Sequence, residues 1–334
     1  MGRIMSNIIL LGEENKRYIY FKKAAETYNI SVDLLKWEAF SLDKIKGKVK
    51  IDPPIYTDKN IKEHSISLKL YRENLKRLSN MENITFLNSP KVILDLLDKE
   101  ESKERLIKKG IKVTPNIEIK AKNFKEVYNQ LKLLKLNRVF IKPRYGSGAM
   151  GIIAMKLNFK KDDVILYTTF KESNRELFNT KEINKVFGFE KSENLFNLLF
   201  DFLNGELIFE KWLPKDKYEN QNYDLRVLYS NKKIVHIIGR ASAGPITNLH
   251  LNNGSINVEK LNLNEEILKK LEVLGTDIFE IFSDLKVVGA DILITPKKEI
   301  FVIELNGQGD QLYSDMYNEN KIYKEQIKEL LNYE

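Results

Sequence analysis

The sequence predicts a mixed α/β and α+β fold, in which a small parallel α/β domain precedes two α+β domains. Short apolar strands alternate with amphipathic helices at the start of the chain, which is typical of a parallel α/β unit. Further on, a glycine-rich stretch at 141–151 lies between two predicted strands, and a β-hairpin is predicted at 287–305. At 334 residues the chain is long enough for two or three such domains.

The composition narrows the class of protein. No apolar run approaches the roughly 20 residues of a membrane span. The first apolar run, Ile8 to Leu11, is too short for a signal-peptide core, so we expect a cytoplasmic protein without membrane contact. The absence of cysteine excludes thiolate zinc, iron–sulfur and cysteine-nucleophile chemistry. The net charge of +8 permits an anionic ligand, but lysine and glutamate are interspersed, so nucleic acid is not the expected partner.

The N-terminal part, about 90 residues, is expected to shape a substrate site. Strands are predicted at 8–11 and 31–35 on either side of a helix at 18–28. A lone Gly12 follows the first strand, and the dinucleotide fingerprint GxGxxG is absent. We therefore do not expect this domain to bind a nucleotide.

The next stretch, 86–99, ends a strand in the turn Asn-Ser-Pro and opens a helix. A second helix, 101–109, should stop at Gly110. Strands are then predicted at 117–120 and 139–142, on either side of a helix at 124–134. By residue type alone, Lys99 could be an ordinary surface lysine.

The segment IKPRYGSGAMG, 141–151, has the character of a phosphate-covering loop. Closely spaced glycines let the backbone approach an anion and point several N–H groups at it. It is not a Walker A loop, because Lys142 precedes the glycines and a strand follows them. An ordinary glycine-rich hairpin is the alternative. The loop residues expected to contact phosphate are Gly146, Ser147, Gly148 and Gly151.

Residues 171–185 are predicted to be an exposed loop and 193–203 an amphipathic helix, with no chemistry assigned to either. In the predicted strand 207–213, the alternation of apolar and polar residues breaks at Glu210 and Lys211. The free backbone groups of such a strand can read an adenine between apolar side chains. Trp212 could equally be a buried aromatic residue.

Two further strands, 223–230 and 233–240, form a predicted hairpin. Its turn places Arg226 opposite the region of Ile237, a few residues from Arg240, so both arginines could point into one cleft and stabilise a transferring phosphoryl group. Ion pairs with Asp224 or Glu210 are the alternative role. The loop that follows contains His250, for which a structural role is favoured over general-base catalysis.

The hairpin at 287–305 carries the candidate metal site. If 296–299 form the loop, Asp291 lies opposite Glu304, and Asn306 shares the face of Glu304. Opposed carboxylates destabilise a hairpin unless a cation lies between them. Two carboxylates and an amide oxygen suit Mg²⁺ or Mn²⁺. The alternative is a hairpin whose acids point into water.

In their order along 86–325, these motifs resemble those of ATP-grasp ligases. GADILI with EIFVIELNG is similar to the closing hairpin of that superfamily, which implies two Mg²⁺ or Mn²⁺ ions on Asp291, Glu304 and Asn306. LNSPKVILDLLDK resembles the linker of glutathione-synthetase-like and RimK-like ligases. That likeness implies that Lys99, together with Lys142, contacts the phosphates of ATP.

The nucleotide site follows from the same resemblance. EKWL is similar to the adenine hinge of D-alanine–D-alanine ligases, which implies that Glu210, Lys211, Trp212 and Leu213 hold the base. Asp-Leu-Arg at 224–226 resembles the Asp-Ile-Arg of RimK-type ligases and makes Asp224 the ribose candidate. Asn248, in a stretch similar to Ser-Asn-Leu-His, is the expected phosphate and metal contact.

The resemblance implies an N-terminal domain at 1–98, a central lid at 99–212 and a C-terminal domain at 213–334. The implied reaction joins a small-molecule carboxylate to an amine, with amino acids or peptides among the candidates, through an acyl phosphate. Arg226, Arg240 and Lys142 are the expected catalytic residues. The alternatives to this function are a kinase, a nucleotide-binding regulator and a polyanion-binding protein. A homodimer is one oligomeric state that the sequence leaves open.

Overall fold

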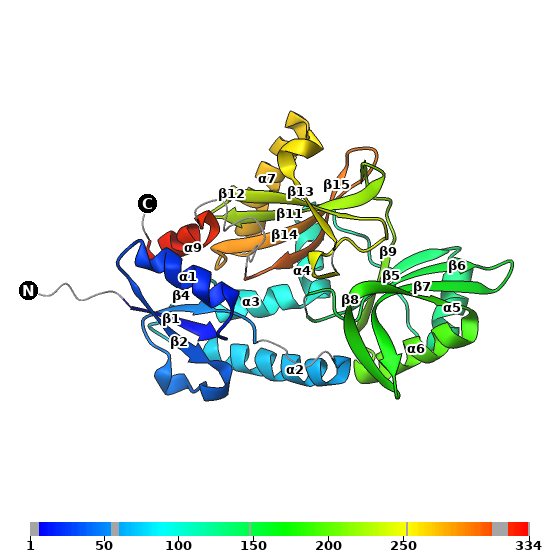
Figure 1. The fold of residues 1–334 in the computed structure, drawn as a ribbon, viewed down its shortest axis with the longest axis horizontal. Coiled ribbons are helices and arrows are strands. Elements are labelled where there is room, and N and C mark those ends of the chain that lie inside the picture. The colour runs from blue at the N-terminus through cyan, green and yellow to red at the C-terminus, as the bar shows by residue number, and fades with distance from the viewer. Residues whose placement is uncertain (1–6, 55–59, 147, 252, 309–319, 333–334) are drawn as a thin grey trace, which may run out of the picture.

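The computed structural model describes residues 7–54, 60–146, 148–251, 253–308 and 320–332. Its strands form three sheets that follow one another along the chain (Figure 1). The mixed α/β and α+β prediction is confirmed. The predicted contact of Ser147 and the side chain of His250 lie outside the described residues.

The N-terminal sheet is parallel, with strand order β2-β1-β3-β4. Both faces of β1 are covered, which explains its uninterrupted apolar sequence. Ile8 and Leu10 pack towards α1 and α9, whereas Ile9 and Leu11 pack towards α2. The elements are β1 (Asn7–Gly12), α1 (Lys16–Glu26), β2 (Ser31–Lys36), β3 (Lys48–Ile51), α2 (Ile61–Leu78) and β4 (Thr85–Phe86). Short 3-10 turns, Trp37–Ala39 and Leu42–Lys44, lie between β2 and β3.

The middle sheet is antiparallel, with strand order β8-β7-β6-β5-β9. Helices α5 and α6 share its apolar core. The elements are α5 (Phe124–Leu133), β5 (Arg138–Pro143), β6 (Ile153–Asn158), β7 (Asp163–Ser173), β8 (Glu176–Phe187), α6 (Phe189–Phe202) and β9 (Leu207–Lys211).

Two predictions in this region are wrong. Residues 171–185, expected to be a loop, form the end of β7 and most of β8. β8 is an edge strand with mostly solvated side chains, so its polar sequence is compatible with pairing to β7. Residues 117–120 form no strand, because contact with β9 ends after the bridge between Asn116 and Glu210 and the bond from Ile117 N to Phe209 O.

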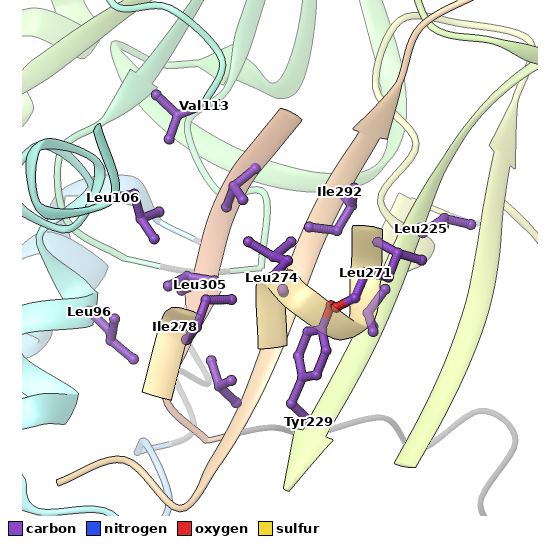
Figure 2. Packing of buried hydrophobic residues seen from close by; sticks show 14 of the residues in the cluster. Leu96, Leu106, Val113, Leu225, Tyr229, Leu271, Leu274, Ile278, Ile292 and Leu305 are labelled. Atoms are coloured by element: carbon purple, nitrogen blue, oxygen red, sulfur yellow. The ribbon is translucent and has the colours of Figure 1, made fainter. Parts of the chain in front are cut away.

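The C-terminal sheet has the strand order β13-β12-β11-β14-β15, with β10 paired to β11. One face packs against α7, α3 and α4. Figure 2 shows Leu274 and Ile278 of α7 among the strand residues, and Tyr229 donates its hydroxyl proton to Leu271 O at 2.8 Å. The elements are α3 (Pro90–Leu97), α4 (Lys99–Lys108), β10 (Lys217–Tyr218), β11 (Gln221–Ser230), β12 (Lys233–Ser242), β13 (Gly254–Asn257), α7 (Glu265–Ile281), β14 (Val287–Ile294), β15 (Ile300–Asn306) and α9 (Lys321–Leu331). Short 3-10 turns, Leu249–Leu251 and Val258–Leu261, flank β13.

Polar caps explain where the helices adjoining the middle of the molecule begin. Asn60 accepts from Lys62 N at 3.0 Å at the start of α2, and Ser89 accepts from Val92 N at 3.1 Å before Pro90 opens α3. Asp98 accepts from Glu100 N at 3.1 Å, which places Lys99 at the first position of α4. No helix in the described part of the chain combines the length and apolar character required to cross a membrane.

Candidate functional site

A cavity of about 710 Å³ is lined by residues from all three parts of the chain. Its walls come from α2, α4, the loop after β5, the end of α6, and strands β9, β11, β12, β14 and β15. Most of the predicted site residues lie on this one surface: Lys99, Lys142, Gly146, Glu210, Lys211, Leu213, Asp224, Arg240, Asn248, Asp291 and Glu304. Asn306 lies beside it, in a smaller hollow that also touches Lys99, Gly146 and Glu304.

One face of the C-terminal sheet carries charged side chains of both signs. Because side chains alternate along β11, Leu225 and Val227 enter the core while Asp224 and Arg226 take the other face. Across the strands, Asp291 is the direct neighbour of Arg226 on one side and of Glu304 on the other. Arg226 and Asp291 are thus an opposite-charge pair that stabilises the sheet, whereas Asp291 and Glu304 are like charges that destabilise it unless a cation lies between them.

Arg240 bridges Asp224 and Asp291 on this face. Its Nε donates to Asp224 Oδ1 at 2.7 Å, and its Nη1 donates to Asp291 Oδ2 at 3.1 Å. Burial alone would lower the pKa of Arg240, but Asp224 and Asp291 raise it above its ordinary value. Asp224 is ionised for the same reason, because Arg240 and Lys215 outweigh burial and lower its pKa.

The register of this hairpin lies one residue from the centre of the predicted region. Arg226 lies opposite Ile238 rather than Ile237, because a bulge between Leu228 and Tyr229 shifts the pairing by one residue. The shift places Arg240 directly opposite Asp224. The ion pair with Asp224, the alternative weighed for this arginine, is therefore present, and Arg240 still lines the cavity.

The predicted pairing of Asp291 with Glu304 is confirmed. The loop of this hairpin is one residue longer than expected, since Ile294 pairs with Ile300, and a bulge after Asp291 restores the register. Burial raises the pKa of Asp291 and Glu304 adds to the rise, against Arg226 and Arg240. Burial also favours neutral Glu304, but Lys99 and Lys142 outweigh it and lower its pKa.

The carboxyl pair has unused capacity for a cation. Asp291 Oδ1 lies 2.7 Å from Arg226 Nη1, yet neither atom makes a hydrogen bond there, so lone pairs of Oδ1 are unused. The Asn306 side-chain nitrogen is also buried without a partner. Within the described ranges, no three His, Asp or Glu side chains gather as a metal cluster. The predicted set has two carboxylates and an amide, which fits a hard cation that takes its remaining ligands elsewhere.

Glu210 of β9 lies between Lys103 of α4 and Lys142 of β5. Its Oε1 accepts from Lys103 Nζ at 2.5 Å, and its Oε2 accepts from Lys142 Nζ at 2.8 Å and Thr114 Oγ1 at 3.0 Å. Burial favours the neutral acid, but Lys103 and Lys142 outweigh it and lower the pKa of Glu210 to about 2. Burial lowers the pKa of Lys103 to about 8, against the opposing effect of Glu210.

Sequence reasoning missed Lys103, which is only 1% exposed. The available signal was its spacing, because Lys99 and Lys103 are four residues apart on α4 and therefore share a face. Lys215 was also missed, within a polar segment that seemed to interrupt the motifs. Its Nζ donates to Asp224 at 3.0 Å and to Thr247 Oγ1 at 2.5 Å, and Thr247 in turn donates to Asp224.

Lys99 reaches the glycine-rich loop. Its Nζ donates to Gly146 O at 2.6 Å, and burial lowers its pKa. The loop turns through left-handed conformations, with φ of +107° at Gly146, +74° at Gly148 and +68° at Gly151. A Cβ on Gly151 would lie 3.0 Å from Pro143 Cγ, so glycine is required there by both space and backbone.

The predicted adenine residues lie at the end of β9. Glu210, Lys211 and Leu213 line the cavity. The Lys211 N–H donates to Pro115 O at 2.9 Å. Trp212 is half-buried and packs against Phe140 with ring centroids 5.2 Å apart.

Comparison with known proteins places the chain in a class. Three solved structures share its fold over nearly the whole length. D-cycloserine synthetase DcsG has a TM-score of 0.63 and 11% identity, covering 97% of this chain and 99% of that one; a Chryseobacterium gregarium RiPP-associated ATP-grasp ligase in complex with ADP and a leader and core peptide has a TM-score of 0.63 and 15% identity, covering 98% and 97%. A D-alanine–D-alanine ligase from Bacillus anthracis complexed with ATP has a TM-score of 0.56 and 12% identity, covering 98% and 96%. The fold is therefore the ATP-grasp fold.

The match to a protein family is more specific than the match to a fold. The family described as YheC/D like ATP-grasp matches residues 95–334, more than half of the chain. The chain belongs to this family, and membership implies that it uses ATP. No curated protein matches the sequence.

Proposed function

We propose that this protein is an ATP-dependent carboxylate–amine ligase that forms an amide bond and releases ADP and phosphate. The main supporting observation is the arrangement of Arg240, Asp291 and Glu304 on one sheet face, at the wall of a cavity that also contains Lys99 and Lys142. Cations and acids so placed suit a triphosphate and the anion that receives its terminal phosphoryl group.

Each group has a separate role in the proposed reaction. Lys99, Lys142 and the loop 146–151 hold the phosphates, and the end of β9 holds the base. Arg226 and Arg240 stabilise the charge that develops as the γ-phosphoryl group passes to the substrate carboxylate. The amine then attacks the acyl phosphate, which forms the amide and releases phosphate. No enzyme nucleophile is required.

Asp291, Glu304 and Asn306 are the residues that would hold Mg²⁺ or Mn²⁺. Their oxygen ligands and the unused lone pairs of Asp291 Oδ1 fit such an ion. When bound, the ion neutralises phosphate charge. Binding can be tested without turnover, since Glu304→Ala should weaken Mn²⁺ binding measured by electron paramagnetic resonance in the presence of a non-hydrolysable ATP analogue.

The test of function is release of ADP and phosphate from Mg²⁺-ATP by the purified protein. The protein is supplied with pooled carboxylic acids, amino acids and small peptides. We expect both products only when a particular acid and an amine are present, and no turnover in Glu304→Ala. ADP without phosphate would identify a kinase instead. Tight ATP binding with no turnover in any pool would favour a regulator.

A further inference from the structure

Helix α2 presents a line of polar and cationic side chains to the cavity. Lys62, Ser65, Lys69 and Arg72 all line it, and their spacing of three, four and three residues places them on one face of the helix. Figure 1 shows α2 running from the N-terminal sheet towards α6 of the lid. None of these residues has a role in the proposed handling of ATP.

Arg72 is held rigidly in this wall. Its guanidinium carbon lies 3.3 Å from the centroid of the Tyr145 ring, which is direct stacking contact. Tyr145 directly precedes Gly146, whose carbonyl oxygen accepts from Lys99 Nζ. The stacking therefore holds the guanidinium next to the glycine-rich loop.

The same guanidinium has an unmet hydrogen bond. Arg72 Nε is buried without an acceptor, and among the described residues no carboxylate pairs with Arg72. Deeper cations on the cavity wall are already satisfied, since Lys142 binds Glu210, and Lys215 and Arg240 bind Asp224. Nε itself is covered, whereas Nη1 and Nη2 are not among the buried atoms that lack a partner and belong to a residue that lines the cavity. These outer donors are therefore suited to an anion supplied by a ligand.

We infer that Arg72 binds a non-reacting anionic group of the acid substrate, so that the substrate is an acid with at least two anionic groups. This inference rests on the proposed function. One carboxylate is activated beside Arg240, and the second lies on Arg72, with Lys69 and Lys62 along the same helix for further negative charge. Planar, stacked arginine suits a carboxylate, which it can bind through two parallel N–H donors.

The experiment measures binding of a triglutamate peptide by calorimetry, with trialanine as the uncharged comparison and a non-hydrolysable ATP analogue present. The variants are Arg72→Gln, Arg72→Lys and the control Lys76→Gln, which removes an exposed charge from α2 outside the cavity lining. We expect the wild type to prefer triglutamate. Arg72→Gln should weaken that binding about 10- to 100-fold, as for loss of a charged hydrogen bond. Arg72→Lys should recover only part of it, and Lys76→Gln should remain within about twofold of the wild type at equal ionic strength.

Two results would overturn the inference. The first is triglutamate binding that is no tighter than trialanine binding or that is unchanged in Arg72→Gln. The second is loss of ATP-analogue affinity in Arg72→Gln with triglutamate binding intact, which would assign the guanidinium to nucleotide phosphates. Triglutamate binding that depends on Arg72 in a protein that never releases ADP would support the anion site while refuting the ligase.

Discussion

Replacing Glu210 by Gln should destabilise the protein by about 3 kcal/mol at pH 7. The carboxylate is 2% exposed and accepts from Lys103, Lys142 and Thr114. Its pKa falls from 4.5 to about 2, and a change of that size corresponds to roughly 3 kcal/mol in favour of the carboxylate. Breaking a buried ion pair from one side typically costs about 3–5 kcal/mol, which agrees.

A double-mutant cycle with Lys103→Met separates the pair from general damage to the core. The double variant eliminates the Lys103 charge that Glu210→Gln alone leaves unpaired, whereas Lys142 keeps its charge in both variants. The double variant should therefore be more stable than the sum of the single losses implies. We expect a coupling of at least about 1–2 kcal/mol. The measurement is urea unfolding followed by the fluorescence of Trp212, which lies two residues from Glu210, with Trp37→Phe as the background.

Additive losses would refute this reasoning. If the two single variants and the double variant agree within about 0.5 kcal/mol of additivity, Lys103 and Glu210 do not form an energetically coupled pair. A loss below about 1 kcal/mol in Glu210→Gln would likewise show that the carboxylate is not ionised and buried as described.

Three further predictions concern the fold, pH and turnover. Gly275→Ala should lower the free energy of unfolding in urea by about 1–3 kcal/mol, because the added Cβ would lie 2.6 Å from the Tyr229 ring. Gly254→Ala, which has open space around it, should change the stability little. Equal effects of the two variants would contradict the packing around Gly275. Lys103 releases its proton in the folded state at a pH of about 8, below its release near 10.5 in the unfolded chain. Between these values the unfolded chain binds more protons, so the wild type should gain about 2 kcal/mol over Lys103→Met from about pH 7 to 9.5; a constant difference would contradict the lowered pKa. Arg240→Lys, which keeps one charge but cannot bridge Asp224 and Asp291, should slow ADP release about 100-fold, and unchanged turnover would remove this arginine from the reaction.

The hairpin at 287–306 could be predicted from the sequence because alternation and turn chemistry are local signals. Asp291 pairs with Glu304 as expected even though the loop and the bulge each differ from the simple pairing rule by one residue, since the two deviations cancel. The hairpin of β11 and β12 contains only one such deviation, so Arg226 pairs with Ile238, one residue from the centre of the predicted region. A bulge depends on tertiary packing and leaves no clear pattern in the residues themselves.

Buried polar residues explain the other omissions. Lys103 and Lys215 lie in stretches rich in lysine and glutamate, where the usual expectation is a solvated surface. Their burial depends on Glu210 and Asp224, which are distant in sequence. Similarly, the polar strand β8 is specified by its partner β7 rather than by its own composition. The burial of these lysines and the formation of β8 thus depend on long-range ion pairs and edge-strand pairing, which local sequence patterns do not reveal.

The position of α9 has a consequence for the order in which the chain folds. Tyr323 and Ile327 of this helix complete the core around Ile8 and Phe21, and Asn320 donates to Tyr20 O across 300 residues of sequence. Figure 1 shows α9 beside α1. The N-terminal sheet therefore has an uncovered apolar face on the ribosome until residues 320–331 have emerged, so its final packing is completed after most of the chain has been synthesised.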